Sequence, residues 1–368
     1  MAMAQRVIIS VTSDLSNDQR VDRMASTLME MGFSVCLVGR QRRDSPPLEP
    51  RAYPARRLRF YFERGKLFYL MYALKMSWWL LFRRVDILLA NDLDTMLPNF
   101  LVARLRGKRL VYDSHEYWTE VPELMHRPLA RAAWRLLERW TFPRVDLAIT
   151  VNQSIAAMYA QSYGLQVNVI RNLPRTAPAA PPVREKEKIL LYQGALNIGR
   201  GIELMIGAMA FLPEYRLVVA GCGPLEAEIR RYAASLPHAD RILFRGLVPP
   251  ARLREETASA MLGMSLEEDL GMSYHFALPN KLFDYIQAGV PVLASDLPEM
   301  AAVVRRHRVG EVLGAEERTP EMLAARIRRM CEGGDKLAEY TANCHGAAKI
   351  LNWESEEQKV RELFRPLL

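Results

Sequence analysis

The segment ILLYQGALNIGRGIELMIGAMAFLPEYRLVVAG (residues 189–221) holds the pattern that decides the predicted fold. Its apolar run at 189–194 is typical of a buried β-strand, and the run at 215–221 has the same character. The residues that follow Gly201 repeat apolar side chains at helical spacing. Apolar strands that alternate with helices favour a parallel sheet with both faces covered.

The same alternation recurs along both halves of the chain. Helices are predicted at 18–31 and 130–140, and the chain from 320 to 368 is predicted to be helical throughout. A segment rich in proline and alanine and then in charge, 176–188, is predicted to link two domains. We therefore predict an α/β fold of two Rossmann-like doubly wound domains that face each other across a cleft, with ligands outside the carboxyl ends of the strands. The other predicted strands are 6–12, 33–39, 85–91, 108–114, 145–152, 241–246, 260–266 and 290–296.

Length and composition agree with this architecture. A chain of 368 residues is too long for one ordinary core and fits two domains. A hydrophobic content of 50% and a charged content of 25% describe a soluble globular protein. The apolar run at 7–11 is too short for a secretory signal. The four cysteines are scattered without metal-ligand spacing, so we expect reduced thiols in a cytoplasmic protein.

Most of the net charge of +8 lies in one stretch of the first half. Residues 40–66 carry nine Lys and Arg against three acidic residues, which leaves a net +6. The apolar segment LFYLMYALKMSWWLLF (67–82) follows, and it is shorter than the ~20 residues that a membrane span needs. We predict a helix buried against a sheet. A basic and aromatic surface over 40–84 that rests on anionic lipid headgroups stays open, while nucleic acid is not expected because the interleaved aromatics of a stacking platform are absent.

Two glycine-rich turns of the second half have features of ligand-binding loops. Gly199-Arg200-Gly201 lies between a strand and a helix, where helix amides and a guanidinium can both face an anion. The alternative is an ordinary loop arginine with glycines for the turn. The run GCGP (221–224) indicates a tight turn that opens another helix. The first strand-to-helix turn, 13–20, contains no glycine, which argues against a nicotinamide-dependent dehydrogenase.

The segment YHFALPNKLFDYIQAG (274–289) predicts a short helix over 279–288. Asn280, Lys281 and Asp284 fall on the face opposite its apolar residues. The free amides of the first turn and the Lys281 ammonium suit a diphosphate, and the Asp284 carboxylate suits the hydroxyl groups of a sugar. The alternative is an exposed ion pair between Lys281 and Asp284 that binds no ligand.

In their order along the chain, these segments resemble the donor-binding domain of retaining GT-B glycosyltransferases of the family 4 type. Segments 86–101 and 110–124 of the first half resemble the acceptor domain of the same family, especially in bacterial enzymes of surface-polysaccharide synthesis. The resemblance covers nearly the whole chain. The donor-side segments are GALNIGRG (194–201), VVAGCGP (218–224), LFRGLV (243–248) and PNKLFDYIQAGVPV (279–292).

The resemblance implies roles for residues of the donor domain. Arg200 takes the position of the basic residue that neutralises the donor diphosphate, and Lys281 joins it in the implied catalytic set. Asp284 matches the second acid of the family's paired-acid motif, which is expected at the nucleotide ribose. The substrate-binding residues implied on this side are Gly194, Gly246, Leu247, Asn280 and Leu282, with Leu247 beside the nucleobase and Asn280 at the phosphates.

The resemblance also implies residues of the acceptor domain. His115 is expected near the transferred sugar and the attacking hydroxyl, although it also fits a histidine that is satisfied at a strand end. Asn17 and Asp18 stand where the family has a glycine pair that touches donor phosphate or acceptor. Asp92 lies in the run NDLD (91–94), which is expected to shape the cleft and to bind substrate rather than a metal ion.

The sequence departs from the family pattern at three places. Phe276 stands where the first acid of the pair is expected, and the acidic residues 267–269 are the candidates to replace it. Ala195 stands where many members have a second phosphate-binding arginine, and we predict that Lys281 supplies that charge. The glycine pair is absent at 17–18.

The function implied by the resemblance is that of a retaining glycosyltransferase. It would move a sugar from a nucleotide diphosphate-sugar to a saccharide or lipid-linked acceptor, in the synthesis of cell-surface polysaccharide or glycoconjugates. No cofactor and no metal ion are implied, because Arg200 and Lys281 would stabilise the leaving phosphate. The alternatives are a non-catalytic GT-B binding module at the membrane surface and a nucleotide-sugar epimerase on the same fold.

The expected location is the cytoplasm or the cytoplasmic face of the membrane. The expected domains are 1–175, a linker at 176–188, 189–349, and a final helix at 350–368 that returns to the first domain.

Overall fold

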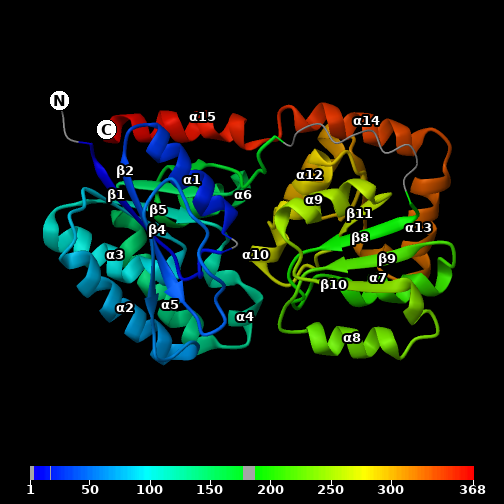
Figure 1. Ribbon diagram of the computed structural model, residues 1–368, viewed down its shortest axis with the longest axis horizontal. Coiled ribbons are helices and arrows are strands. Elements are labelled where there is room, and N and C mark those ends of the chain that lie inside the picture. The colour runs from blue at the N-terminus through cyan, green and yellow to red at the C-terminus, as the bar shows by residue number, and fades with distance from the viewer. Residues whose placement is uncertain (1–3, 17, 177–186) are drawn as a thin grey trace. The chain divides into compact units, whose positions relative to one another are not determined.

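The computed structural model describes residues 4–16, 18–176 and 187–368. The chain forms two compact units (Figure 1). Unit 1 runs to Asn172 and resumes at Ser355–Leu368, and unit 2 comprises Leu173–Glu354. The predicted linker at 176–188 falls for most of its length outside the described residues.

Unit 1 is built on a seven-stranded sheet in the order β3-β2-β1-β4-β5-β6-β7, and every pair of neighbours is parallel. The chain order reverses between β1 and β4, and such a switch point is where open parallel sheets bind ligands. The strands are β1 (Arg6–Ser10), β2 (Ser34–Gln41), β3 (Ala55–Arg59), β4 (Ile87–Asn91), β5 (Arg109–Ser114), β6 (Leu147–Thr150) and β7 (Val167–Val169).

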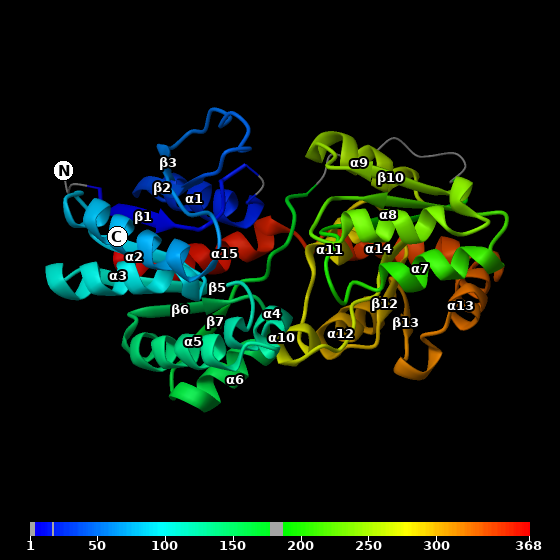
Figure 2. The same cartoon turned by 90° about the horizontal axis from the view of Figure 1, so that it is seen from below.

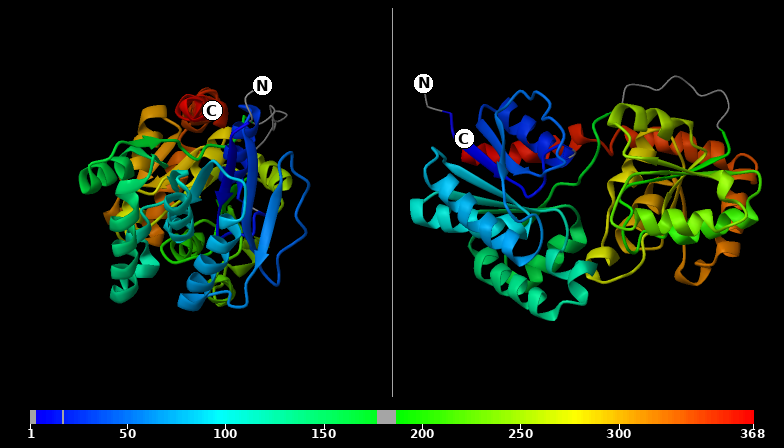
Figure 3. Two further views of the ribbon diagram at one scale, coloured as in Figure 1. Left: turned by 90° about the vertical axis from the view of Figure 1, so that its left-hand side faces the viewer. Right: turned by 60° about the horizontal axis from the view of Figure 1, so that its bottom comes forward.

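Helices flank this sheet on both sides (Figures 2 and 3). Helices α1 and α15 meet through an ion pair between Glu30 and Arg361 at 2.7 Å, and α15 belongs to unit 1 from Ser355 onward. Helix α3 packs against both α2 and α5. The bounds are α1 (Gln19–Glu30), α2 (Gly65–Leu81), α3 (Leu93–Arg106), α4 (Pro122–Met125), α5 (Pro128–Thr141), α6 (Gln153–Tyr163) and α15 (Trp353–Phe364).

Unit 2 repeats the architecture on a six-stranded parallel sheet in the order β10-β9-β8-β11-β12-β13. Its switch point lies between β8 and β11. The strands are β8 (Ile189–Gln193), β9 (Arg216–Ala220), β10 (Ile242–Gly246), β11 (Leu262–Ser265), β12 (Val292–Ser295) and β13 (Gly310–Leu313). The helices are α7 (Ile202–Ala208), α8 (Glu226–Ala234), α9 (Pro250–Ser259), α10 (Met272–His275), α11 (Asn280–Gln287), α12 (Pro298–His307), α13 (Pro320–Glu332) and α14 (Lys336–Ala348).

Two hydrophobic cores, one on each face of the second sheet, stabilise unit 2. Along β8, Leu190 and Tyr192 belong to one core and Leu191 to the other, because successive side chains of a strand point to opposite faces. The first core is completed by α7, α8 and α13, and the second by α11, α12 and α14. This two-sided burial explains why the strands of the opening segment are apolar at nearly every position.

Every strand that the sequence predicts is present, and the prediction of two doubly wound α/β units is confirmed. Strands β3, β7 and β13 were not predicted. The helix predicted over 279–288 begins one residue later, since Pro279 is its N-cap in extended backbone. The prediction that 67–82 is a buried helix is correct for only one side of α2. On its other side Leu67, Leu70, Leu74 and Trp78 are exposed, and so is Phe82, which directly follows the helix. No helix within the described residues combines the length and the apolar character needed to cross a bilayer.

Candidate active site

Tyr285 of α11 fixes the strands at the switch point of unit 2. Its hydroxyl donates to the carbonyl of Leu191 at 3.1 Å, lies 3.3 Å from the carbonyl oxygen of Met264, and accepts the N–H of Gln193 at 3.1 Å. Gly263 makes room for the ring, since a Cβ there would lie 2.4 Å from it. The apolar face of α11 therefore determines where its polar face meets the ends of β8 and β11.

Two cations and one carboxylate meet at this switch point, and we call Arg200, Lys281 and Glu267 the cation cluster. The Lys281 Nζ lies 2.7 Å from the Glu267 Oε1, and an Arg200 guanidinium nitrogen lies 3.4 Å from the same oxygen. Glu267 is completely buried and Lys281 is 7% exposed. The Lys281 ammonium also lies over the ring of Tyr192, 4.2 Å from its centroid, and the Arg200 guanidinium lies over the ring of Tyr274 at 4.8 Å.

The cation cluster holds more positive than negative charge. Burial alone would raise the pKa of the Glu267 carboxyl, but Lys281 and Arg200 outweigh burial and hold that pKa below its ordinary value. Burial lowers the pKa of the Lys281 ammonium, against the opposing effect of Glu267. With all three groups charged, the cluster carries a net +1, which suits an anion that approaches the strand ends.

Asp284 lies one turn further along α11 and is oriented by a chain of hydrogen bonds. The Gln193 side-chain amide donates to the Asp284 Oδ2 at 2.9 Å, and the Thr257 hydroxyl donates to the Gln193 side-chain oxygen at 2.8 Å. The Asp284 carboxylate is half-buried. The alternative of an exposed Lys281–Asp284 ion pair is wrong, because Lys281 is buried against Glu267 instead.

The other residues predicted on the donor side differ in their accessibility. Asn280 is exposed at the first position of α11, and Leu247 is 67% exposed directly after Gly246, whose φ is +65°. Gly194 follows β8 with a φ of +137°, and a Cβ there would lie 3.6 Å from the Lys281 side chain. Leu282 differs from these residues, because its side chain is completely buried in the second core of unit 2, where it packs the helix against the sheet.

The loop before α11 holds the candidates to replace the acid missing at Phe276. Glu267 faces the two cations of the cluster and pairs with both Arg200 and Lys281. Asp269 pairs with the His275 imidazole at 2.8 Å. The Phe276 ring lies edge-on to the same imidazole, with 4.8 Å between the ring centroids.

The switch point of unit 1 brings a histidine between two carboxylates. The His115 backbone N–H donates to the Asp92 Oδ1 at 2.8 Å, and the His115 Nδ1 lies 3.3 Å from the Asp92 Oδ2. The His115 Nε2 lies 3.5 Å from Asp113, the carboxylate near the end of β5. Arg20 of α1 binds both oxygens of Asp113, at 2.6 and 3.1 Å, and both of these side chains are buried.

The charges of this network are set by burial and by its neighbours. Burial alone would lower the pKa of the His115 imidazole, but Asp92 and Asp113 outweigh it and raise that pKa to about 9. Burial would raise the pKa of Asp113, but Arg20 and His115 hold it far below the ordinary value. Burial, with Asp92 nearby, raises the pKa of Asp94 to about 7. His115 is therefore a cation at neutral pH with a carboxylate near each ring nitrogen, an arrangement that fits both the proposed site and a histidine that is satisfied at a strand end.

The loop before α1 has a structural role. Asp18 is the N-cap of α1: its Oδ1 accepts the Val21 N–H at 3.4 Å, and its Oδ2 accepts the Ser13 hydroxyl at 3.0 Å. Asn17 lies outside the described residues. Asp92 precedes α3 with a φ of +59°, and this backbone conformation turns its carboxylate toward His115.

Sequence reasoning missed three residues that shape these sites. Arg20 and Asp113 form a hydrogen bond although 93 positions of sequence separate them, and Gln193 and Asp284 do so although 91 positions separate them. The only signals in the sequence are the polar residues at the ends of strands, namely the Asp113 that ends the apolar part of β5 and the Gln193 that ends β8. Asp94 was visible in the run NDLD, but its burial and raised pKa were not.

The electrostatics of His115 lead to a testable expectation. We expect an NMR titration of the His115 ring to have its midpoint near pH 9, and Asp92→Asn to lower it by at least about one unit, because a carboxylate that favours the imidazolium is removed. The folded pKa lies above the ordinary 6.5, so this interaction stabilises the fold fully below pH 6.5 and is lost as the pH rises through 9. The exposed His126 gives an internal reference signal. An unchanged midpoint in Asp92→Asn would contradict the assignment.

Comparison with known proteins identifies both halves of the chain. Residues 19–175 match the model of Glycosyltransferase Family 4, and residues 175–345 match that of Glycosyl transferases group 1. A putative glycosyltransferase, EpsD of Bacillus subtilis (strain 168), is 25% identical over 217 residues, which cover 53% of this chain and 53% of that protein. The match therefore spans about half the length of this curated relative.

Solved structures match the fold over almost the whole chain. Sucrose-phosphate synthase from Thermosynechococcus elongatus has a TM-score of 0.81 at 19% identity, with 99% of each chain covered. Anabaena Alr3699/HepE in complex with UDP-glucose has a TM-score of 0.75 at 15% identity, with 98% of this chain and 99% of that chain covered. The two units thus have the GT-B fold, and the chain carries a Glycosyltransferase Family 4 domain in its first half and a Glycosyl transferases group 1 domain in its second.

Proposed function

We propose that this protein is a retaining glycosyltransferase that moves a sugar from a nucleotide diphosphate-sugar to a saccharide or lipid-linked acceptor, in the synthesis of cell-surface polysaccharide or glycoconjugates. The observation that carries the proposal is the cation cluster at the switch point of unit 2. There Arg200 and Lys281 share one buried carboxylate, Glu267, and keep a net positive charge at the ends of β8 and β11. Anabaena Alr3699/HepE, which shares the fold, has been solved in complex with UDP-glucose.

The chemistry of sugar transfer explains why two cations are useful there. When the bond between the sugar and the nucleoside diphosphate breaks, negative charge develops on the departing phosphate oxygens. Fixed positive groups that already point at those oxygens stabilise this charge without reorganisation. Glu267 holds the Lys281 ammonium in place at 2.7 Å, so the cation does not move when the leaving group forms. In this proposal Arg200 and Lys281 supply the positive charge, and no metal ion is required.

Asp284 and His115 complete the proposed roles. Asp284 is oriented by Gln193 at 2.9 Å and would accept the ribose hydroxyls of the nucleotide. His115 is a cation between Asp92 and Asp113, and it would donate to a hydroxyl of the transferred sugar from unit 1. The retaining outcome rests on the family resemblance of these motifs.

A nucleotide screen tests the donor site. We expect one of UDP, GDP and ADP, each at the same concentration, to raise the Tm, and the matching nucleoside without phosphates to raise it far less. At a hundredfold excess over Kd the stabilisation is about 2.7 kcal/mol, or roughly 5–10 °C for a unit of this size. The absence of a shift with all three nucleotides would favour the non-catalytic module instead.

The stereochemistry is tested by slow hydrolysis of the donor, which needs no knowledge of the acceptor. Water would replace the acceptor, and NMR would record the anomer of the released sugar before it equilibrates. Release of the anomer of the donor supports retention, and release of the opposite anomer overturns it. Conversion of the donor into its epimer, with no release of nucleotide, would indicate the epimerase.

Activity that persists in excess chelator supports catalysis without a metal ion.

A further inference from the structure

The outer side of three neighbouring helices of unit 1 exposes large apolar side chains, and we call this surface the apolar face. Helix α2 packs against α3, and α3 packs against α5. Ring contacts join them as well, between Tyr69 and Trp134 at 5.1 Å and between Phe100 and Trp140 at 4.9 Å. The exposed apolar residues of this face are Leu67, Leu70, Leu74, Trp78, Phe82, Leu101, Leu105, Leu129, Leu136 and Trp140.

Helix α2 shows that this exposure is unusual. Its inner row of Phe68, Tyr72, Met76 and Leu80 is buried against the rest of the unit. The opposite side is as apolar as the inner row, yet Leu74 is 65% exposed and Trp78 is 68% exposed. A helix that is apolar on all sides is ordinarily enclosed, and a contiguous apolar patch on a surface marks an interaction site.

The exposed charges on the same three helices have one sign. Their ranges 65–81, 93–106 and 128–141 contain two acidic residues, Asp94 and Glu138, and both are buried. The basic residues on or directly after these helices are Lys66, Lys75, Arg83, Arg84, Arg104, Arg106, Arg131, Arg135, Arg139 and Arg144. The exposed charges of these three helices are therefore cationic, with no exposed carboxylate on any of them.

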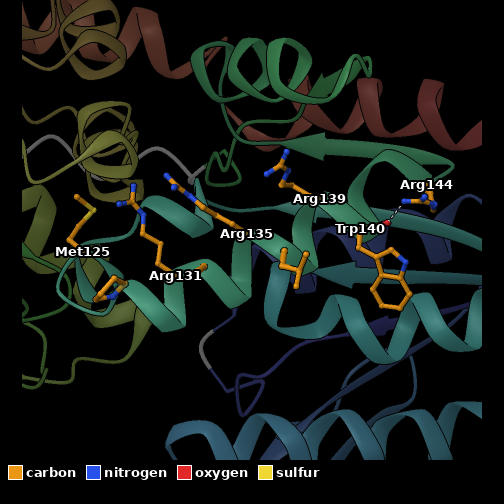
Figure 4. A pocket seen from close by; sticks show the side chains of 9 residues that line it. Met125, Arg131, Arg135, Arg139, Trp140 and Arg144 are labelled. Carbon is orange, nitrogen blue, oxygen red and sulfur yellow. Dashed lines mark hydrogen bonds between the residues drawn. The ribbon is translucent and has the colours of Figure 1, made fainter.

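An arginine row along α5 shows how these cations are arranged (Figure 4). Arg131, Arg135 and Arg139 follow one another at one turn of helix, and they line a cavity of about 670 Å³ together with Leu136, Trp140 and Arg144. Arg131 and Arg135 pair with Glu120, which neutralises part of this row. Figure 4 shows the arginine side chains on one edge of α5 and the Trp140 indole toward another, so apolar and basic groups lie next to each other.

We propose that the apolar face binds the surface of a membrane that contains anionic phospholipids. Leucine and tryptophan side chains at such a surface enter the boundary between headgroups and acyl chains, while arginines bind the phosphates. A second copy of this chain fits less well, because two identical cationic faces would repel each other. The surface is separate from the cation cluster of unit 2, so the proposal does not depend on the proposed activity.

Vesicle flotation with the full-length protein tests the proposal. We expect the protein to float with vesicles of phosphatidylglycerol and phosphatidylcholine and not with vesicles of phosphatidylcholine alone. Binding should weaken as salt is raised, because the electrostatic part is screened. Binding to both kinds of vesicle with equal strength, or to neither, would overturn the proposal.

Two pairs of substitutions assign the binding to this face. Leu74→Ser with Trp78→Ser is expected to weaken vesicle binding by at least about tenfold, since both side chains lose their apolar contact. Arg83→Gln with Arg84→Gln is expected to weaken it by about fivefold for each charge. The matched controls are exposed residues of unit 2, Ile350→Ser and the pair Arg252→Gln with Arg254→Gln, which should bind as the wild type does.

A second copy of this chain is the other partner that the apolar face could bind, and the oligomeric state of the protein tests this possibility. We expect light scattering to give the same mass for the wild type and for the Leu74→Ser, Trp78→Ser protein without lipid. A wild-type dimer that these substitutions convert to a monomer would assign the face to a second copy and overturn the membrane proposal. Equal vesicle binding by the wild type and both pairs of variants would overturn it too. Because all four side chains are exposed, their replacement is expected to leave the Tm unchanged, and a circular-dichroism melt checks this.

Discussion

Replacement of either Arg200 or Lys281 with methionine is expected to weaken binding of the nucleoside diphosphate by about tenfold to a hundredfold. A hydrogen bond to a charged group contributes about 1.5–3 kcal/mol, which corresponds to this range of Kd. Both cations lie within 3.4 Å of the same Glu267 oxygen, so we expect the two losses to be similar. Isothermal titration of the nucleotide identified by the screen measures them directly.

Burial makes Lys281 the harder of the two residues to test. Lys281→Met leaves the carboxylate of Glu267 buried with Arg200 as its remaining cation at 3.4 Å, and a buried charge that loses a partner costs up to about 3–5 kcal/mol of folding free energy. Weak binding by this variant would then have two explanations. Glu267→Gln removes the stranded charge, so the double variant Lys281→Met, Glu267→Gln is expected to recover most of the Tm.

A comparison of Glu267→Gln with the double variant Lys281→Met, Glu267→Gln separates the loss of the Lys281 charge from a loss of folding stability. We expect Glu267→Gln alone to bind the diphosphate at least as tightly as the wild type, because the anion no longer competes with a carboxylate for the two cations. The double variant should have a Tm close to that of Glu267→Gln, but it should bind the diphosphate about tenfold to a hundredfold more weakly than Glu267→Gln does. If the double variant and Glu267→Gln bind equally well, Lys281 does not contact the diphosphate, and the proposal that it replaces an arginine at Ala195 fails.

The strands that the sequence missed share a place in the sheets, although the predicted strand β10 also lies at an edge. The predicted strands β1, β4, β8 and β11 lie at the centre, where two covered faces demand apolar residues at every position. The missed strands β3, β7 and β13 all lie at sheet edges. β3 has the sequence ARRLR, and its residues are exposed or only half-buried, so no apolar run predicts this strand. An edge strand that lacks an apolar run is identified by the strand with which it pairs, and the sequence alone does not name that strand.

The candidate sites show the same division between local and long-range information. Arg200 and Lys281 were predicted because each lies in a local motif, a glycine-flanked turn and the first turn of a short helix. Their common partner Glu267 lies 67 positions from Arg200, and only the pairing of β8 with β11 brings it there. Leu282 was predicted from the same local motif as Lys281. It follows Lys281 in the motif, but its side chain lies on the core face of α11.

Replacement of Arg20 with methionine is expected to cost about 3–5 kcal/mol of folding free energy, because it breaks a buried ion pair. Arg20 binds both oxygens of Asp113 and donates to the carbonyl of Ile170 at 2.8 Å. Arg20 is 2% exposed and Asp113 is completely buried, so the variant leaves a carboxylate in the interior without its main partner. For a unit of this size the expected fall in Tm is roughly 6–20 °C.

Two further variants test whether the stranded charge causes the loss. Arg20→Met with Asp113→Asn removes both charges, and we expect it to recover a large part of the stability, since neutral partners of similar size replace a buried pair at little cost. Arg361→Met is the matched surface control: its pair with Glu30 is partly exposed and should be worth no more than about 1 kcal/mol. A double variant no more stable than Arg20→Met would show that packing, and not charge, explains the loss.

The same substitution reports on the proposed active site through His115. Arg20 opposes the positive charge of the His115 imidazole, while Asp113 favours it. Arg20→Met is therefore expected to raise the midpoint of the His115 titration above about 9, and Arg20→Met with Asp113→Asn to lower it below the value of the single variant. A midpoint that does not respond to either change would mean that the Arg20–Asp113 pair stabilises the fold without setting the charge of His115. A midpoint that rises in Arg20→Met and falls from that raised value in the double variant would show that one buried ion pair does both, linking the first helix of unit 1 to the chemistry at its switch point.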